Sequence, residues 1–316
     1  AGGYYLYGTL DSLNMLYAIH VLFAIVLALA GLVPVVALVS RWFDAERGTA
    51  IGVALVGSSL ASFVFPPIAE KWLIPSYGWR DAFQFEAIAA LIGFAIVVLL
   101  VRSSPAERGL KPYGAKEAAP LRSDALPGLT VAQTVRTMSF WVLGGCAFLT
   151  FFAMLGTLYQ LPIYLGTVGV KEISLGYMAM LGAALIGKFL FGFLADRLGP
   201  KRVFIANMAV MAIGAALLAI ATPGSVFLAL AVFGIGWGGL YTMLQLLTVE
   251  NFGLKATGKI MGLIAIFDCV GGGLGSFVMA SIFDATQSYR PAFWMLCGMI
   301  VVALIAATRI RQEFRT

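Results

Sequence analysis

The chain has 316 residues, of which 61% are apolar and only 11% are charged. Ordinary soluble domains carry about 25% charged residues, and a soluble globule has too little interior to hide so much apolar surface. The composition therefore excludes a soluble protein and predicts a polytopic membrane protein. Its apolar stretches run to about 20 residues, the length of a membrane-crossing helix, which also excludes an outer-membrane barrel.

Hydropathy and helix breakers predict an all-α chain with nine full transmembrane helices. A short apolar segment at 1–10 comes first, and residues 103–137 form a polar linker with four prolines and three glycines. The predicted spans lie near 15–40, 50–73, 82–102, 139–165, 173–195, 203–221, 225–250, 258–283 and 291–310.

Lysine and arginine predict the orientation of these spans. If the linker is cytoplasmic, 16 of the 21 basic residues lie on its side of the membrane and four on the other. Such a bias is typical of cytoplasmic loops, so we expect the C-terminus inside. It also explains the net charge of +6 without nucleic acid as a partner.

The two halves of the chain contain a parallel repeat. Gly52 precedes Phe83 by 31 residues, and Gly262 precedes Phe293 by the same interval, so the repeat is shifted by 210 positions. The second half has 124 residues before its repeat at Gly262, whereas the first half has only 51 before Gly52. We therefore expect about 73 missing N-terminal residues, enough for two helices and part of a third. The predicted domains are an incomplete first lobe at 1–102, a central loop at 103–137 and a six-helix second lobe at 138–316.

The loop after the span at 173–195 carries the most specific motif. Residues 192–202 read Gly-Phe-Leu-Ala-Asp-Arg-Leu-Gly-Pro-Lys-Arg and resemble the signature between helices 8 and 9 of the major facilitator superfamily. The resemblance implies two six-helix lobes and a motif that braces the cytoplasmic side in the outward-facing state. Positive-inside topology alone is an alternative for Lys201 and Arg202. The motif positions are Gly192, Asp196, Arg197, Gly199, Lys201 and Arg202.

A closer resemblance covers most of the chain. Residues 40–52 with Gly78-Trp79-Arg80, and residues 251–253 with 283–293, are similar to the bacterial monocarboxylate/oxalate–formate branch. This resemblance implies uptake or exchange of small organic anions across a bacterial inner membrane. The same fold carrying another solute, such as a sugar, drug or aromatic acid, is the alternative.

Lys188 lies eight residues before Asp196, about 12 Å into its span at helical rise. A cation at that depth costs a few kcal/mol unless it is paired or hydrated, which indicates a functional residue. The branch that this chain resembles places a cation, usually arginine, on helix 8 to meet the substrate carboxylate. Lysine lacks the bidentate fork of arginine. The alternative is a lysine that reaches the membrane surface.

Asp268 is an acid near the bilayer centre in the span at 258–283. A pair with Lys188 is one expectation, and a carboxyl group whose protonation follows substrate occupancy would couple protons to transport. The alternative is a static ion pair. Four further polar or aromatic residues are candidates for completing a substrate pocket, with helix packing as the alternative. They are Tyr159, Gln160, Tyr241 and Gln245.

Other residues give weaker signals. His20 is the only histidine, and a backbone carbonyl can satisfy a single neutral imidazole. The glycines at 271–275 follow no strand, so we interpret them as helix-packing residues. With three scattered cysteines and no cluster of ligands or catalytic groups, we expect no cofactor, no metal and no enzyme activity. The expected partners are the bilayer, a small organic anion and protons, and the expected assembly is a monomer.

Overall fold

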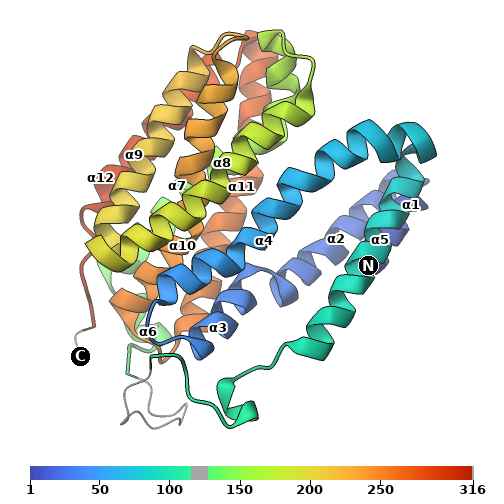
Figure 1. Ribbon diagram of the computed structural model, residues 1–316. Helices are drawn as coiled ribbons and strands as arrows, with labels where there is room; N and C mark the ends of the chain where they lie inside the picture. The colour runs from blue at the N-terminus through green and yellow to red at the C-terminus, as the bar shows by residue number, and fades with distance from the viewer. Residues whose placement is uncertain (115–126, 315–316) are drawn as a thin grey trace. The chain divides into compact units, whose positions relative to one another are not determined.

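The computed structural model describes residues 1–114 and 127–314 (Figure 1). Every regular element in these residues is a helix. The chain divides into two compact units, one of Ala1–Ala45 with Val64–Ala115 and the other of Glu46–Phe63 with Lys116–Thr316. These units differ from the predicted lobes, because residues 46–63 group with the second half. The lobe boundaries themselves remain a prediction.

The first unit begins with α1 (Gly2–Gly8), α2 (Leu13–Ala30) and α3 (Leu32–Trp42). The predicted span at 15–40 is interrupted in the structure, because Gly31 is extended (φ −78°, ψ −160°) and separates α2 from α3. Pro34 lies in the first turn of α3, where an amide has no intrahelical partner. The sequence can therefore start a helix here more easily than continue one.

Aromatic contacts join α1 to its neighbours in the first unit. Tyr7 stacks on Phe83 of α5 with ring centroids 4.9 Å apart, and its hydroxyl lies 3.1 Å from Nε2 of His20. His20 Nδ1 also lies 2.9 Å from the Leu16 carbonyl oxygen. The backbone-satisfied histidine expected from the sequence is therefore what the structure contains.

Helix α4 (Arg47–Ile68) continues into a π-helix (Ala69–Leu73) and then α5 (Ile74–Leu100). The sequence predicted two spans separated by a loop near 74–81, but only Gly78 leaves the helical conformation (φ 83°, ψ 162°). Pro66 and Pro67 lie in the last turn of α4, which ends at Ile68. Because proline lacks the amide proton of the α-helical ladder, a change to π-helical pairing directly after them is understandable. A 3-10 turn (Pro105–Arg108) follows in the linker.

The second unit contains the short α6 (Val131–Thr134) and six long helices, whose ends lie within three residues of the predicted spans. Seven described stretches are long and apolar enough to cross a membrane, and these six are among them. The seventh, Val64–Leu100, runs through the kink at Gly78. The six are α7 (Met138–Val168), α8 (Ile173–Leu198), α9 (Pro200–Ala219), α10 (Val226–Phe252), α11 (Thr257–Thr286) and α12 (Arg290–Ala307).

Glycines set the closest helix crossings in this unit. Helix α10 packs along α8, and α11 packs along α7 (Figure 1). A Cβ atom at Gly238 would overlap the carbonyl oxygen of Ala184, and one at Gly275 would overlap that of Phe152. Glycine four residues earlier, at 234 and 271, meets the neighbouring backbone in the same way. Small residues at this spacing allow backbones to approach closely, so both glycine pairs are packing elements.

Candidate functional site

The last turn of α8 contacts the start of α4, within the second unit. Oδ2 of Asp196 accepts a hydrogen bond from the Thr49 hydroxyl (2.7 Å) and a second from the Thr49 amide (3.2 Å). The first amides of a helix have no intrahelical acceptor, so a carboxylate there satisfies a donor and interacts favourably with the helix dipole. Gly199 turns the chain into α9 with φ 86°, a conformation that favours glycine. Asp196 therefore links the last turn of α8 to α4.

The basic residues of the motif have different surroundings. The Arg197 guanidinium lies 4.1 Å above the ring of Phe193. Lys201 Nζ donates to the carbonyl oxygens of Thr308 (2.9 Å) and Ile310 (2.7 Å), directly after α12. Arg202 is exposed, and Gly192 is buried within α8. The sequence placed Lys201 in the gating motif, with positive-inside topology as the alternative. It did not predict these partners, because nothing local to the motif reveals a contact more than 100 residues away.

Lys188 lies on α8, two turns before Asp196, and is half-buried. Its backbone carbonyl faces α4, because a Cβ atom at Gly52 would lie 3.1 Å from that oxygen. The lysine is therefore on a stretch of α8 that passes close to α4.

Three of the six predicted pocket residues come together on α10 and α11. Asp268 is only 7% exposed, and Tyr241 interacts electrostatically with it and with the side chain of Gln245. Within the described residues, Asp268 Oδ1 and Gln245 Oε1 are buried acceptors without a hydrogen-bond partner. Because buried acceptors are costly when unsatisfied, these atoms form a polar cluster that can receive hydrogen bonds from a ligand or from water.

The sequence predicts an interaction between Lys188 and Asp268. The two residues lie on helices that pack along different neighbours. Lys188 lies on α8, which packs along α10, whereas Asp268 lies on α11, which packs along α7. Since Asp268 Oδ1 accepts no hydrogen bond from the described residues, the pair remains a prediction.

The two predicted residues on α7 have separate environments. Tyr159 is 62% exposed. Gln160 donates from Nε2 to the Ser276 carbonyl oxygen (3.1 Å) and accepts at Oε1 from the Tyr289 hydroxyl (2.8 Å). Burial, with a contribution from Asp284, raises the pKa of Tyr289 to about 12, so the phenol keeps its proton and donates. Gln160 therefore connects α7, α11 and the start of α12.

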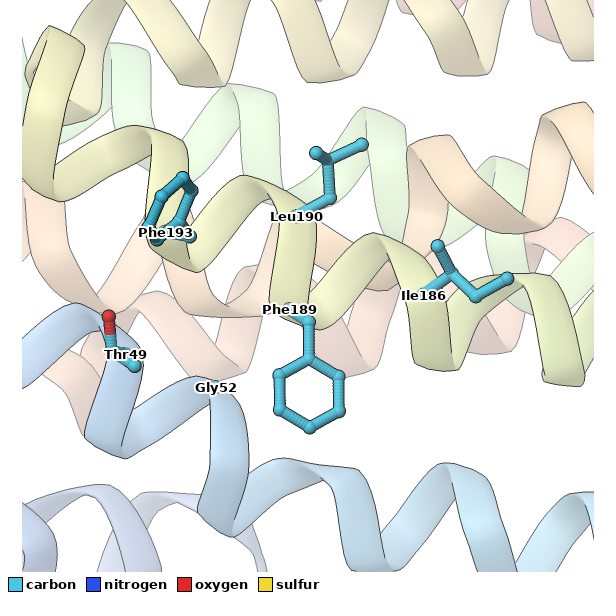
Figure 2. A pocket seen from close by; sticks show the side chains of 6 residues that line it. All are labelled: Thr49, Gly52, Ile186, Phe189, Leu190 and Phe193. Carbon is cyan, nitrogen blue, oxygen red and sulfur yellow. The ribbon is translucent and has the colours of Figure 1, made fainter.

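An apolar groove lies next to the Asp196–Thr49 contact. It has a volume of about 500 Å³ and is lined by residues of α4 and α8 (Figure 2). No pattern in the sequence predicted this groove, because its residues look like ordinary lipid-facing positions of two separate spans. The lining residues are Thr49, Gly52, Ile186, Phe189, Leu190 and Phe193.

Candidate metal-ligating side chains are scattered in the part of the chain that the structure describes. No three His, Cys, Asp or Glu side chains gather there in a group that could hold an ion.

Membrane-length helices and a buried polar cluster define the class as a multi-pass α-helical membrane protein. Residues 1–276 and 168–314 match the family model of the Major Facilitator Superfamily. The chain belongs to this superfamily of transporters, whose members are not enzymes.

Relatives within the superfamily transport different solutes, according to their names. The chain is 26% identical over 309 residues to the probable nitrate/nitrite transporter NarK2 of Mycobacterium tuberculosis, covering 92% of this chain and 72% of that protein. It is 27% identical over 279 residues to monocarboxylate transporter 13 of Bos taurus, covering 85% and 61%. The chain spans between about half and three quarters of the length of the curated relatives it matches.

The fold is also that of solved transporters. The crystal structure of the E. coli fucose:proton symporter FucP matches with a TM-score of 0.67 at 15% identity, covering 98% of this chain and 81% of that one. At that identity the likeness concerns the fold alone. The match to the family model confirms the superfamily suggested by the motif at 192–202.

Proposed function

We propose that the full-length protein is a secondary active transporter of small monocarboxylate-like anions, coupled to protons. The observation that carries this proposal is the buried cluster of Asp268, Tyr241 and Gln245, with two acceptors that no described residue satisfies. An ionisable group kept in a membrane-spanning helix at such a cost is expected to act on a substrate or an ion. The similarity to monocarboxylate transporter 13 supports a carboxylate as the solute.

In this proposal Lys188 and Asp268 have complementary roles. Lys188 attracts the substrate anion, and Asp268 takes up the proton that travels with it. Asp196 contributes to the cytoplasmic gate, since its contact with Thr49 can form in one conformation and break in another. We further propose a monomer in a bacterial inner membrane with a cytoplasmic C-terminus.

Nitrate is a second candidate solute, favoured by the similarity to the probable nitrate/nitrite transporter NarK2. Nitrate carries the same single charge as a monocarboxylate, so Lys188 would serve either anion. Nitrate exchange would not need Asp268 as a proton acceptor. The two candidates therefore differ in which variant abolishes transport.

The test uses the full-length gene product in liposomes that enclose a pH-sensitive dye. Lactate, pyruvate, formate, oxalate, nitrate and a sugar are added in turn to the wild type, Lys188→Ala and Asp268→Asn. Lys171→Ala is the matched control, because Lys171 is exposed in the loop between α7 and α8.

We expect carboxylate-driven acidification of the lumen that both site variants lose and the control keeps. Because protonated acids leak through bilayers, only the variant-sensitive part of the signal counts. Nitrate exchange moves no protons, so nitrate that enters the liposomes is measured directly with isotope-labelled nitrate. Nitrate uptake that needs Lys188 but not Asp268 would replace the first candidate with the second. No variant-sensitive signal for any anion would overturn the proposal while leaving the fold assignment intact.

A further inference from the structure

The groove between α4 and α8 has an almost entirely apolar lining. Figure 2 shows Phe189 extending from α8 toward the α4 side of the groove. The four side chains that α8 contributes are between 43% and 59% exposed. A volume of about 500 Å³ lies within the ~300–1,000 Å³ typical of small-molecule sites. The groove is therefore large enough for a ligand rather than for a single solvent molecule.

The polar groups at the groove are already engaged. Thr49 is the one polar side chain among the six lining residues, and both its hydroxyl and its amide donate to Asp196. A polar solute would find no donor or acceptor on the described lining and would lose its hydration without compensation. The part of a ligand that enters this groove must be apolar.

A cation lies at one end of the groove. The Arg197 guanidinium packs over Phe193, which lines the groove, and is itself exposed to the surface. The neighbouring Asp196 carboxylate is held by Thr49, whereas Lys201 is held by the carbonyl oxygens after α12. An arginine in this position matches a phosphate group, which it can bind through two parallel hydrogen bonds.

An apolar groove that ends at an exposed arginine matches an amphiphile with an anionic head. We propose that this groove binds one anionic phospholipid, with an acyl chain along Ile186, Phe189 and Leu190 and the phosphate on Arg197. The lipid comes from the leaflet on the side of the α8–α9 loop. This proposal does not depend on which solute is transported.

The lipid site adjoins the predicted gate. Thr49 and Phe193 both line the groove, and Asp196 follows Phe193 by one turn of α8. A lipid bound there contacts α4 and α8 together, so it stabilises whichever conformation keeps the two helices at this separation. Lipid composition then shifts the equilibrium of the gate.

The experiment counts phospholipids that remain bound to the purified chain. The protein is equilibrated in nanodiscs of phosphatidylcholine with increasing phosphatidylglycerol, and the bound lipid is measured by native mass spectrometry after gentle release. Ile186→Trp fills the groove, and Arg197→Gln removes the cation. Ile213→Trp and Arg202→Gln are matched controls, because Ile213 is 56% exposed on α9 and Arg202 is exposed outside the groove.

We expect the wild type and both controls to retain one phosphatidylglycerol in preference to phosphatidylcholine. Loss of a hydrogen bond to a charged group predicts a roughly tenfold weaker retention in Arg197→Gln, and Ile186→Trp should lower retention of either lipid by a similar factor.

Three results would overturn the lipid site. Equal retention by Ile186→Trp and Ile213→Trp would exclude the groove as the binding place. Equal retention of the two lipids, unchanged in Arg197→Gln, would exclude headgroup recognition. A change of oligomeric state in Ile186→Trp without a change in bound lipid would mean that a second copy of the chain covers the groove.

Discussion

At the scale of single residues, the contact between Asp196 and Thr49 joins positions 147 residues apart in the sequence. One carboxylate oxygen receives both donors, and the acceptor carries charge, which makes such hydrogen bonds stronger than neutral ones. The site is partly exposed, so solvent reduces the gain. The side chain of Thr49 is the component that a substitution can remove while the backbone donor stays.

We expect Thr49→Val to lower stability by about 1 kcal/mol, because it removes the hydroxyl donor and keeps the shape of the side chain. Thr49→Ser, which retains the hydroxyl, should behave almost as the wild type. Thermal unfolding in detergent of Thr49→Val, Asp196→Asn and the double variant measures the coupling between the two residues. Strictly additive effects would contradict a direct interaction, since residues in contact give non-additive changes.

The sequence predicted the motif around Asp196 but not its partner. The Asp196-Arg197 pair at a helix end is a local pattern, whereas the choice of Thr49 depends on how distant helices pack. The same limit applies to Gln160, whose two hydrogen bonds go to residues more than 100 positions away. Its polarity inside a span suggested a ligand contact, with helix packing as the alternative, and the structure shows its amide connecting helices.

At the scale of helices, the spacing of apolar runs and helix breakers predicted the structure better than local motifs predicted the contacts of single residues. The six spans of the second half were predicted closely because long apolar runs and their breakers are local features. The first half was harder, since Gly31 interrupts an apolar run whose hydropathy alone reads as one span. After Pro66 and Pro67 the outcome is reversed. The sequence predicted two separate spans, at 50–73 and 82–102, but the chain stays helical beyond the prolines until Gly78.

The glycines of α11 differ sharply in what surrounds them. Gly275→Ala should weaken the crossing of α11 with α7, because the new methyl group would overlap the Phe152 carbonyl oxygen. We expect a loss of about 1–3 kcal/mol, as for other overpacked sites. Gly273→Ala is the matched control, because no atom lies within 4 Å of its added Cβ. Alanine there should be neutral or slightly stabilising. Thermal unfolding compares the two variants, and equal melting temperatures would contradict the proposed crossing.

The segment after α12 is attached to three helices. Lys201 holds Thr308 and Ile310, Ser139 of α7 exchanges hydrogen bonds with the backbone of Arg311, and the Phe314 amide donates to Asn251 of α10. These contacts keep the chain close to the ends of α7, α9 and α10. A hydrophobicity plot cannot reveal this, because the segment is short and polar.

Lys201→Met should release the residues that follow α12. Loss of its two hydrogen bonds predicts about 1 kcal/mol easier local opening, and hence roughly fivefold faster trypsin cleavage after Arg309 and Arg311. Arg202→Met removes a neighbouring exposed cation and serves as the control. Mass spectrometry of timed digests measures both rates. If the two variants are cleaved equally fast, Lys201 does not hold the segment.

At the scale of the whole molecule, charge distribution predicts how the chain lies in the membrane. The basic residues are strongly biased toward the loops on the side of 103–137, and this bias decides orientation through the loops rather than through net charge. The described helices fix which loops share a side, because each membrane crossing reverses direction. The loop between α7 and α8 and the segment after α12 must therefore lie on opposite sides.

Fusions of green fluorescent protein and alkaline phosphatase in a bacterial host test this orientation. Since the first fluoresces only in the cytoplasm and the second is active only outside it, a C-terminal fusion should be fluorescent and inactive as a phosphatase. Fusion after Lys171, in the loop between α7 and α8, should show the reverse. An active phosphatase at the C-terminus would invert the molecule and place Asp196, Arg197 and the groove beside them at the outer leaflet. The gate and the lipid site would then respond to external conditions, so this measurement determines which leaflet supplies the lipid.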